Sequence, residues 1–184
     1  MLRQAVLLPS YDASLEDIIA HLQVHYYEAL TALQAQAMAY LRLLQSAGTH
    51  PFHSFSIACE DTLGKVGLTI DFFSRRVLPY TKELDEKAQS GHDCTHCSGG
   101  CDMGHKALLM ELHQGHGELR RAMYELYTTA LPLYSNLEYP EVYKSLRKEL
   151  HVMDTALHHL IYLEESWLMP KLLESQKKIH AYTF

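Results

Sequence analysis

The chain has 184 residues, of which 47% are hydrophobic and 21% charged, with only 9 Gly and 6 Pro. This length suits a single domain over residues 1–184 with a core of its own, and the composition excludes an intrinsically disordered or fibrous chain. The formal net charge is −6 and no run of Lys and Arg occurs, so the basic face that nucleic-acid binding requires is missing. We therefore expect a compact helical protein without a nucleic-acid partner.

The hydrophobic residues are dispersed along the chain. No segment approaches 18 uninterrupted apolar residues, and the apolar run within residues 1–9 is shorter than the central region of a signal peptide. The sequence thus predicts a soluble cytoplasmic protein without a membrane partner, where cysteines are thiols or metal ligands rather than disulfides. This expectation matters because the chain has 13 His and 4 Cys, and three of the Cys lie within eight residues.

Two helices are predicted in the first half of the chain. Ser14 suits an N-cap, Glu16 and Asp17 suit a first helical turn, and apolar residues then recur with a 3.6-residue period. The first helix is expected over about 15–46, where Ala47 and Gly48 end it. The second is expected over about 54–88, with a bend at Pro79.

The second half of the chain begins with a break in this pattern. Residues 89–105 contain several glycines and predict a Cys/His-rich loop, after which a third apolar stripe runs from Leu108 to Ala130 and stops at Pro132. Pro140 suits the first turn of a fourth helix, whose apolar seam alternates steps of three and four up to Trp167. Four helices with short links predict an all-α, up-down-up-down four-helix bundle.

A few polar side chains are expected to face the bundle interior. At 100° per residue, Glu164 falls in the middle of the fourth apolar stripe, His116 faces inward on the third helix, and His113 lies at the edge of that face. On the first helix, His25 lies to one side of the apolar stripe and shares a flank with His21. A core carboxylate is costly unless it is paired, protonated or bound to a cation, so Glu164 is either a ligand or an acid satisfied by a neighbour.

Three segments carry a resemblance to a known family. They are residues 163–170 (LEESWLMP), residues 77–80 (VLPY), and His113 followed by residues 117–119 (GEL). Together they resemble the hemerythrin-like cation-binding domains, nearest to the di-iron proteins that repair damaged iron–sulfur centres, over roughly residues 14–175. The resemblance implies a hemerythrin-like bundle with iron held between the helices.

The chain departs from this family at the metal positions. The family places a Glu six residues before each helix-terminal Pro and a His four residues before that Glu. The fourth helix keeps Glu164 but has Leu160 in place of the His, and the second helix has Phe73 and Thr69 in place of the Glu and the His. A carboxylate-bridged pair of iron ions needs about six protein ligands. The substitutions therefore argue against a standard di-iron site.

The first helix departs as well, because Tyr27 stands where the family would place an imidazole and His25 is displaced by two residues. Three interpretations of the interior stay open. The first is a remodelled site that binds a single iron or other transition metal ion. The second is a metal-free core, in which Phe73 and Leu160 fill the former cavity and Glu164 hydrogen-bonds to His116. The third is a two-metal centre with substitute ligands. The expected ligands of the remodelled site are His25, His113, His116 and Glu164.

The predicted loop is the second candidate metal site. Cys94 and Cys97 have the spacing of half a zinc knuckle, and Cys101 with His105 could complete a Cys3His tetrahedron for zinc. Thiolates also bind iron–sulfur clusters and Cu(I), so the spacing does not select the metal. A redox-active Cys94/Cys97 pair and a loop with idle thiols are the alternatives.

Two functions follow from these observations. The first is a hemerythrin-like metal-binding protein that handles or senses metal ions, O2 or NO, in iron-centre repair or a stress response. The second is a non-enzymatic regulatory or interaction bundle with only a structural zinc in the loop and a metal-free core. No motif for metal-free catalysis is visible, and whether the protein is an enzyme stays open. A homodimer is compatible with the tyrosines expected on the surface, which are Tyr124, Tyr127, Tyr134 and Tyr139.

Overall fold

The computed structural model describes residues 13–48, 51–92, 100–133 and 139–181. These residues form helices joined by short connections, and no strand occurs among them. The helices make four continuous rods, so the predicted all-helical four-rod architecture is confirmed. In chain order the rods are α1 (Leu15–Leu22), η1 (Gln23–Tyr27) and α2 (Glu28–Ser46); α3 (His53–Phe72), η2 (Phe73–Val77) and α4 (Leu78–Gln89); α5 (Gly100–Ala130) and η3 (Leu131–Leu133); and α6 (Glu141–Leu163), η4 (Glu164–Leu168) and α7 (Met169–Ala181).

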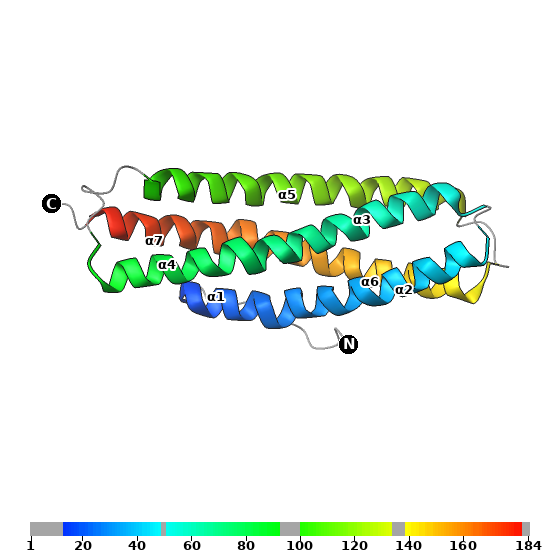
Figure 1. The fold of residues 1–184 in the computed structure, drawn as a ribbon, viewed down its shortest axis with the longest axis horizontal. Helices are drawn as coiled ribbons and strands as arrows, with labels where there is room; N and C mark the ends of the chain where they lie inside the picture. The colour runs from blue at the N-terminus through cyan, green and yellow to red at the C-terminus, as the bar shows by residue number, and fades with distance from the viewer. Residues whose placement is uncertain (1–12, 49–50, 93–99, 134–138, 182–184) are drawn as a thin grey trace.

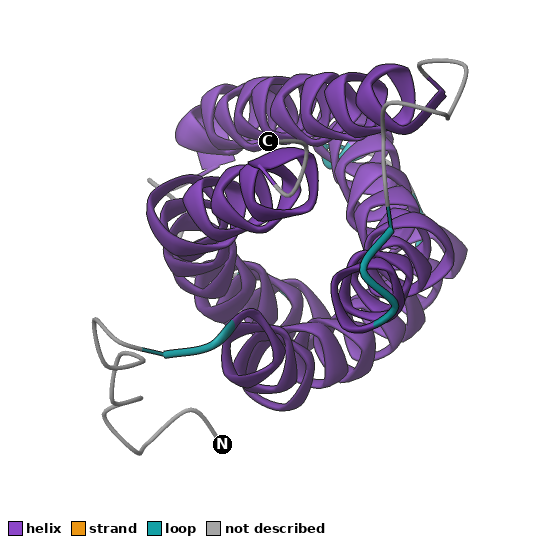
Figure 2. Ribbon diagram, turned by 90° about the vertical axis from the view of Figure 1, so that its left-hand side faces the viewer, coloured by secondary structure: helices purple, strands orange, loops and turns teal. Residues whose placement is uncertain are grey.

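The rods lie side by side along the long axis of the molecule (Figure 1). Figure 2, viewed along the bundle, shows them arranged around a common axis. α2 packs against α3 and α6, α3 packs against α5, and α4 packs against α7. Each rod turns an apolar stripe inward, and these stripes form one continuous core.

The first rod begins where the sequence predicted. Ser14 caps α1, because its Oγ accepts a hydrogen bond from the Asp17 backbone N–H at 3.1 Å. Asp17 returns the bond by accepting the Ser14 backbone N–H at 3.0 Å, which completes a capping box. A side-chain cap of this kind stabilises a helix by about 1 kcal/mol.

Each of the first, second and fourth rods contains a π-helical segment, named η1, η2 and η4. At η2 the backbone N–H of Leu78 bonds to the carbonyl of Phe73, five residues earlier, and Pro79 follows directly. η4 is arranged in the same way before Pro170, where the Met169 N–H bonds to the Glu164 carbonyl. The sequence predicted a bend at Pro79, and the structure places a π-helical turn immediately before it. The backbone hydrogen bonds are shifted by one residue in this turn, and the shift accommodates the absence of a backbone N–H on proline.

The third rod begins earlier than predicted. The expected loop ran to residue 105, whereas α5 starts at Gly100 and already includes Gly104 and His105. Each glycine costs a helix about 1 kcal/mol relative to alanine. Burial of His105 and Leu108 against the bundle offsets that cost. The sequence signal was wrong here because packing overrides local propensity.

In the part of the chain that the structure describes, no helix combines the length and the apolar content that crossing a bilayer requires.

Candidate functional site

Glu164 lies in the bundle interior, as its place in the apolar seam predicted. Its side chain has no solvent exposure. The Tyr27 hydroxyl donates a hydrogen bond to Oε1 at 2.5 Å, and His116 Nε2 lies 2.7 Å from Oε2. Both carboxylate oxygens therefore have a side-chain partner, and the three residues come from three different rods.

The π-helical segments position this site. Tyr27 is the last residue of η1, Phe73 is the first of η2, and Glu164 is the first of η4. Tyr27 stacks on Phe73 and hydrogen-bonds to Glu164, so these segments meet at one level of the bundle. Single π-helical turns inside α-helices occur frequently at functional sites. Their coincidence marks this level as the candidate site.

His116 links the buried carboxylate to the surface. Its Nδ1 lies 3.2 Å from Oε1 of Glu165, and Oε2 of Glu165 accepts a 2.8 Å hydrogen bond from the Arg120 guanidinium. His116 is 1% exposed, whereas the Arg120 side chain is 47% exposed. His116 therefore contacts a different carboxylate through each of its two ring nitrogens. The result is a chain of polar groups from the core to solvent, which we call the Glu164 network (Tyr27, Glu164, His116, Glu165 and Arg120).

The outer part of the Glu164 network is held by charge. The hydrogen bond from Arg120 lowers the pKa of Glu165 below its usual range, and His116 contributes in the same direction. The same bond raises the pKa of Arg120. This partly exposed pair fixes one end of the network in its ionised form.

The inner part of the site is held by burial and stacking. Burial raises the pKa of Tyr27 well above its usual range, and the Glu164 carboxylate adds to the shift. Tyr27 therefore stays a neutral phenol, and its hydroxyl donates a hydrogen bond to Glu164. Its ring stacks on Phe73 with centroids 3.7 Å apart. Phe73 and Leu160 are both fully packed in the core.

The predicted ligands of the bundle site separate into two groups. The structure brings His116 and Glu164 together as expected, but His25 and His113 are exposed and do not join them, which corrects the expected interior set. His25 lies within η1, where the π-helical pairing invalidates a wheel drawn at 100° per residue. It instead lies beside His21, with ring centroids 4.7 Å apart. His113 was placed at the edge of the inward face, and that edge is open to solvent.

Sequence reasoning missed the outer part of the Glu164 network. Glu165 and Arg120 were not singled out, although Arg120 lies four residues after His116 and so projects from the same side of α5. That spacing, together with the acidic residue adjacent to Glu164, is the signal that could have indicated them.

The loop site falls largely outside the described residues. Cys94 and Cys97 are not among the described residues. Cys101 is in the first turn of α5, and its side chain is likewise outside the description. His105 is described and is 3% exposed. The fourth cysteine, Cys59, is a free thiol in the core, where burial raises its pKa to about 12.

The orientation of His105 is set by two neighbouring rods. Tyr80 on α4 donates its single hydroxyl proton to Gln176 Oε1 on α7 at 2.7 Å, and His105 Nδ1 lies 2.6 Å from the same hydroxyl oxygen. The Tyr80 hydroxyl therefore fixes the orientation of the His105 ring through Nδ1. Histidines that bind a metal through one nitrogen are commonly held by a neighbour at the other nitrogen in this way.

The residues at the level of Glu164 do not fit a di-iron centre. Within the described ranges, no group of three or more His, Cys, Asp or Glu is arranged to hold a metal ion. Glu164 and Glu165 face different nitrogens of His116 and so cannot share one ion with that ring.

Comparisons with known proteins give no match: no family model, no curated protein and no solved structure is similar to this chain. The hemerythrin-like relationship therefore stays a proposal that rests on the sequence motifs.

Proposed function

We propose that this chain is a hemerythrin-like bundle that works as a non-enzymatic regulatory or interaction module. In this proposal the Glu164 network occupies the level at which the family holds iron. The observation that carries the proposal is that both carboxylate oxygens of Glu164 have a side-chain partner: Tyr27 contacts one of them and His116 the other. A buried carboxylate with these partners needs no cation to compensate its burial.

Two apolar substitutions support the same conclusion. Phe73 and Leu160 fill the core beside the carboxylate, and neither side chain can bind a metal. The order of the rods in Figure 1, connected at alternate ends, is compatible with the hemerythrin-like topology. The family's iron chemistry would then be absent while its scaffold is kept.

The experiment is a metal analysis of protein purified from iron-supplied cells under reducing conditions. Wild type is compared with Glu164→Ala, and with Glu125→Ala as a control at an exposed position on α5. We expect no iron or manganese in any of the three proteins. Stoichiometric iron that is lost in Glu164→Ala and kept in Glu125→Ala would refute the proposal.

A second candidate function is a protein that senses metal ions or small oxidants such as O2 or NO through a single ion. It is favoured by the convergence of the Tyr27 hydroxyl and His116 Nε2 on one carboxylate. The Glu164 carboxylate and the His116 imidazole are ligand types that suit a transition metal ion. The same metal analysis decides between the two functions, since only this one predicts a metal that depends on Glu164.

We further propose that zinc is held by Cys94, Cys97, Cys101 and His105. The support is the orientation of His105, whose Nδ1 is engaged by Tyr80. One zinc per chain is expected, and it should be lost in His105→Ala but kept in His113→Ala, an exposed histidine on the same helix. Thiol titration before and after chelation gives a second readout. Three thiols that react rapidly before chelation would contradict a filled site.

A further inference from the structure

Two histidines that the Glu164 network does not use lie together on the first rod. His21 is in the last turn of α1, and His25 is in η1, four residues later. Side chains at this spacing on a helix project to the same side. The two imidazole rings have centroids 4.7 Å apart and are tilted by 47° to each other. The π-helical pairing of η1 therefore does not separate them.

The distance between the two rings is that of two ligands on one metal ion. A transition metal ion lies about 2.1 Å from an imidazole nitrogen, and hence about 3.2 Å from the centroid of the ring. Two rings bound at about 90 to 110° to each other at the ion therefore have centroids about 4.5 to 5.2 Å apart. The 4.7 Å between His21 and His25 falls within this range.

His21 has a ring nitrogen that lacks a partner. Its Nε2 is buried and makes no hydrogen bond among the described residues. Burial lowers the pKa of His21, and the adjacent His25 adds to the shift. At neutral pH the ring is therefore neutral, which is the form that binds a metal ion. His25 is exposed, so its ring can change rotamer, which opens the space between the rings and directs a second nitrogen into it.

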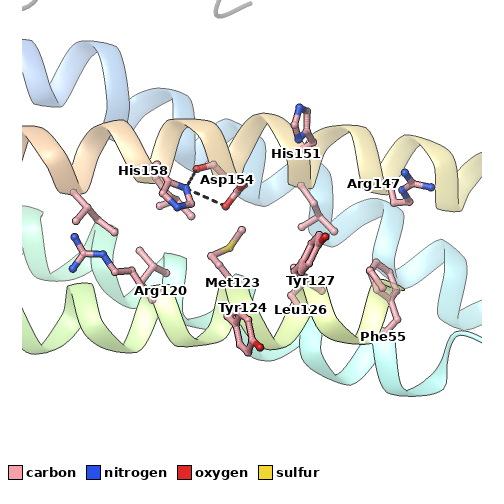
Figure 3. A pocket seen from close by; sticks show the side chains of 15 residues that line it. Phe55, Arg120, Met123, Tyr124, Leu126, Tyr127, Arg147, His151, Asp154 and His158 are labelled. Atoms are coloured by element: carbon pink, nitrogen blue, oxygen red, sulfur yellow. Dashed lines mark hydrogen bonds and ion pairs between the residues drawn. The ribbon is translucent and has the colours of Figure 1, made fainter. Parts of the chain in front are cut away.

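The histidines of α6 provide a contrast. His158 Nδ1 lies 2.9 Å from the backbone carbonyl oxygen of Asp154 and 3.2 Å from its carboxylate Oδ1, as the dashed lines in Figure 3 mark. His151 is about two helical turns away from His158, and the two rings lie apart in the same view. His21 and His25 differ from these side chains because their rings lie directly beside each other.

The charges around the pair favour a cation. The described part of the first rod has three acidic residues within two turns of the pair and no Lys or Arg before Arg42. Of the elements packed against α1, α4 has two Lys and three acidic residues, and η4 has two Glu. α6, which packs against η1, has three basic and three acidic residues. The balance stays negative when Arg120, the partner of Glu165, is included.

The pair supplies two ligands to an ion. No His, Cys, Asp or Glu among the described residues completes it to a set of three. Asp17, one turn before His21, has its carboxylate in the capping box with Ser14. Leu22 follows His21 at the position where helical zinc-peptidase pairs carry a catalytic Glu, so the pair does not indicate hydrolytic chemistry. The remaining coordination positions of an ion are open to water or to a ligand from solution.

We propose that His21 and His25 form a two-histidine site for a divalent transition metal ion. The affinity of such nitrogen ligands follows the order of the first-row metals, so Cu²⁺ binds more tightly than Ni²⁺ or Zn²⁺. The inference goes beyond the proposed function, because the pair lies outside both the Glu164 network and the predicted Cys/His loop. It concerns an exchangeable ion that is added to the protein, not an ion retained through purification.

The test is equilibrium dialysis of the full-length protein against NiCl2 at neutral pH. Wild type is compared with Gln23→His/His25→Gln, which keeps the composition but places the two histidines on opposite sides of the helix at exposed positions. His113→Gln controls for the loss of an exposed histidine elsewhere. We expect wild type and His113→Gln to bind one more Ni²⁺ per chain than the exchanged variant, or to bind that ion at least tenfold more tightly.

An NMR titration gives an independent readout, because paramagnetic Ni²⁺ broadens the ring-proton signals of the histidines that bind it. We expect the signals of His21 and His25 to broaden together, at a lower Ni²⁺ concentration than the signals of His113. Circular dichroism checks that each variant is folded. Three results would overturn the proposal: equal Ni²⁺ binding by wild type and the exchanged variant, an equal loss in His113→Gln, or broadening of His113 before His21 and His25.

Discussion

Replacement of His116 by leucine would leave Glu164 with one fewer partner in the core. Tyr27 alone would then face a carboxylate that has no exposure to solvent. Breaking a buried charged pair by removing one member costs about 3 to 5 kcal/mol of the free energy of unfolding. That loss is a large share of the roughly 5 to 15 kcal/mol that a domain has in total.

A second substitution should restore part of this loss. In the double variant His116→Leu/Glu164→Leu, no charge is left in the core, and only the Tyr27 hydroxyl lacks an acceptor, at about 1 to 3 kcal/mol. We therefore expect the double variant to be more stable than His116→Leu by about 2 kcal/mol. In a chain of this size, the single substitution should lower Tm by about 6 to 20 °C.

The assay is urea unfolding followed by far-UV circular dichroism, with the slope against urea checked for each variant. His113→Leu is the matched control, because it removes an exposed histidine from the same helix and should change the free energy of unfolding by less than about 0.5 kcal/mol. If the double variant were less stable than His116→Leu, the two side chains would not compensate each other, and the reasoning from the buried pair would be refuted.

Three further predictions follow from the same geometry. Tyr27→Phe removes a donor to Glu164 and should cost about 1 to 3 kcal/mol in urea unfolding, so an unchanged free energy would contradict the 2.5 Å bond. Glu165→Gln should cost about 1 kcal/mol or less at neutral pH, because Arg120 is half exposed. Since the folded pKa of Glu165 lies below its ordinary value of 4.5, this stabilisation is present above pH 4.5 and lost as the pH falls through the folded value; a difference between wild type and Glu165→Gln that persists at lower pH would contradict it. Cys59 has a pKa of about 12 and should not react with a thiol reagent at pH 8 in folded protein, so Cys59→Ser should leave the number of rapidly reacting thiols unchanged, and a decrease by one would contradict its burial.

Much of the fold could be predicted from local sequence signals. The capping residue Ser14, the proline at position 140 and the 3.6-residue periodicity located the rods, because these signals act within one or two turns of helix. The start of α5 at Gly100 could not be predicted in this way. There the packing of later residues decides the conformation of the preceding turn, and no local pattern reports it.

The candidate site was predictable only in its centre. Glu164 and His116 stand out because a polar residue inside an apolar stripe is visible on any helical wheel. The orientation of His25 was not predictable, because a π-helical turn shifts every angle on the wheel and depends on contacts between rods. The link from Glu165 to Arg120 likewise joins two rods, and helical periodicity describes one rod at a time.

Anomalous diffraction at the iron edge, from crystals of wild-type protein grown with ferrous iron under reducing conditions, tests the central claim most directly. We predict no anomalous peak beside Glu164, and electron density in which its two oxygens contact the Tyr27 hydroxyl and His116 Nε2. A peak within coordination distance of Glu164 and His116 would contradict the account.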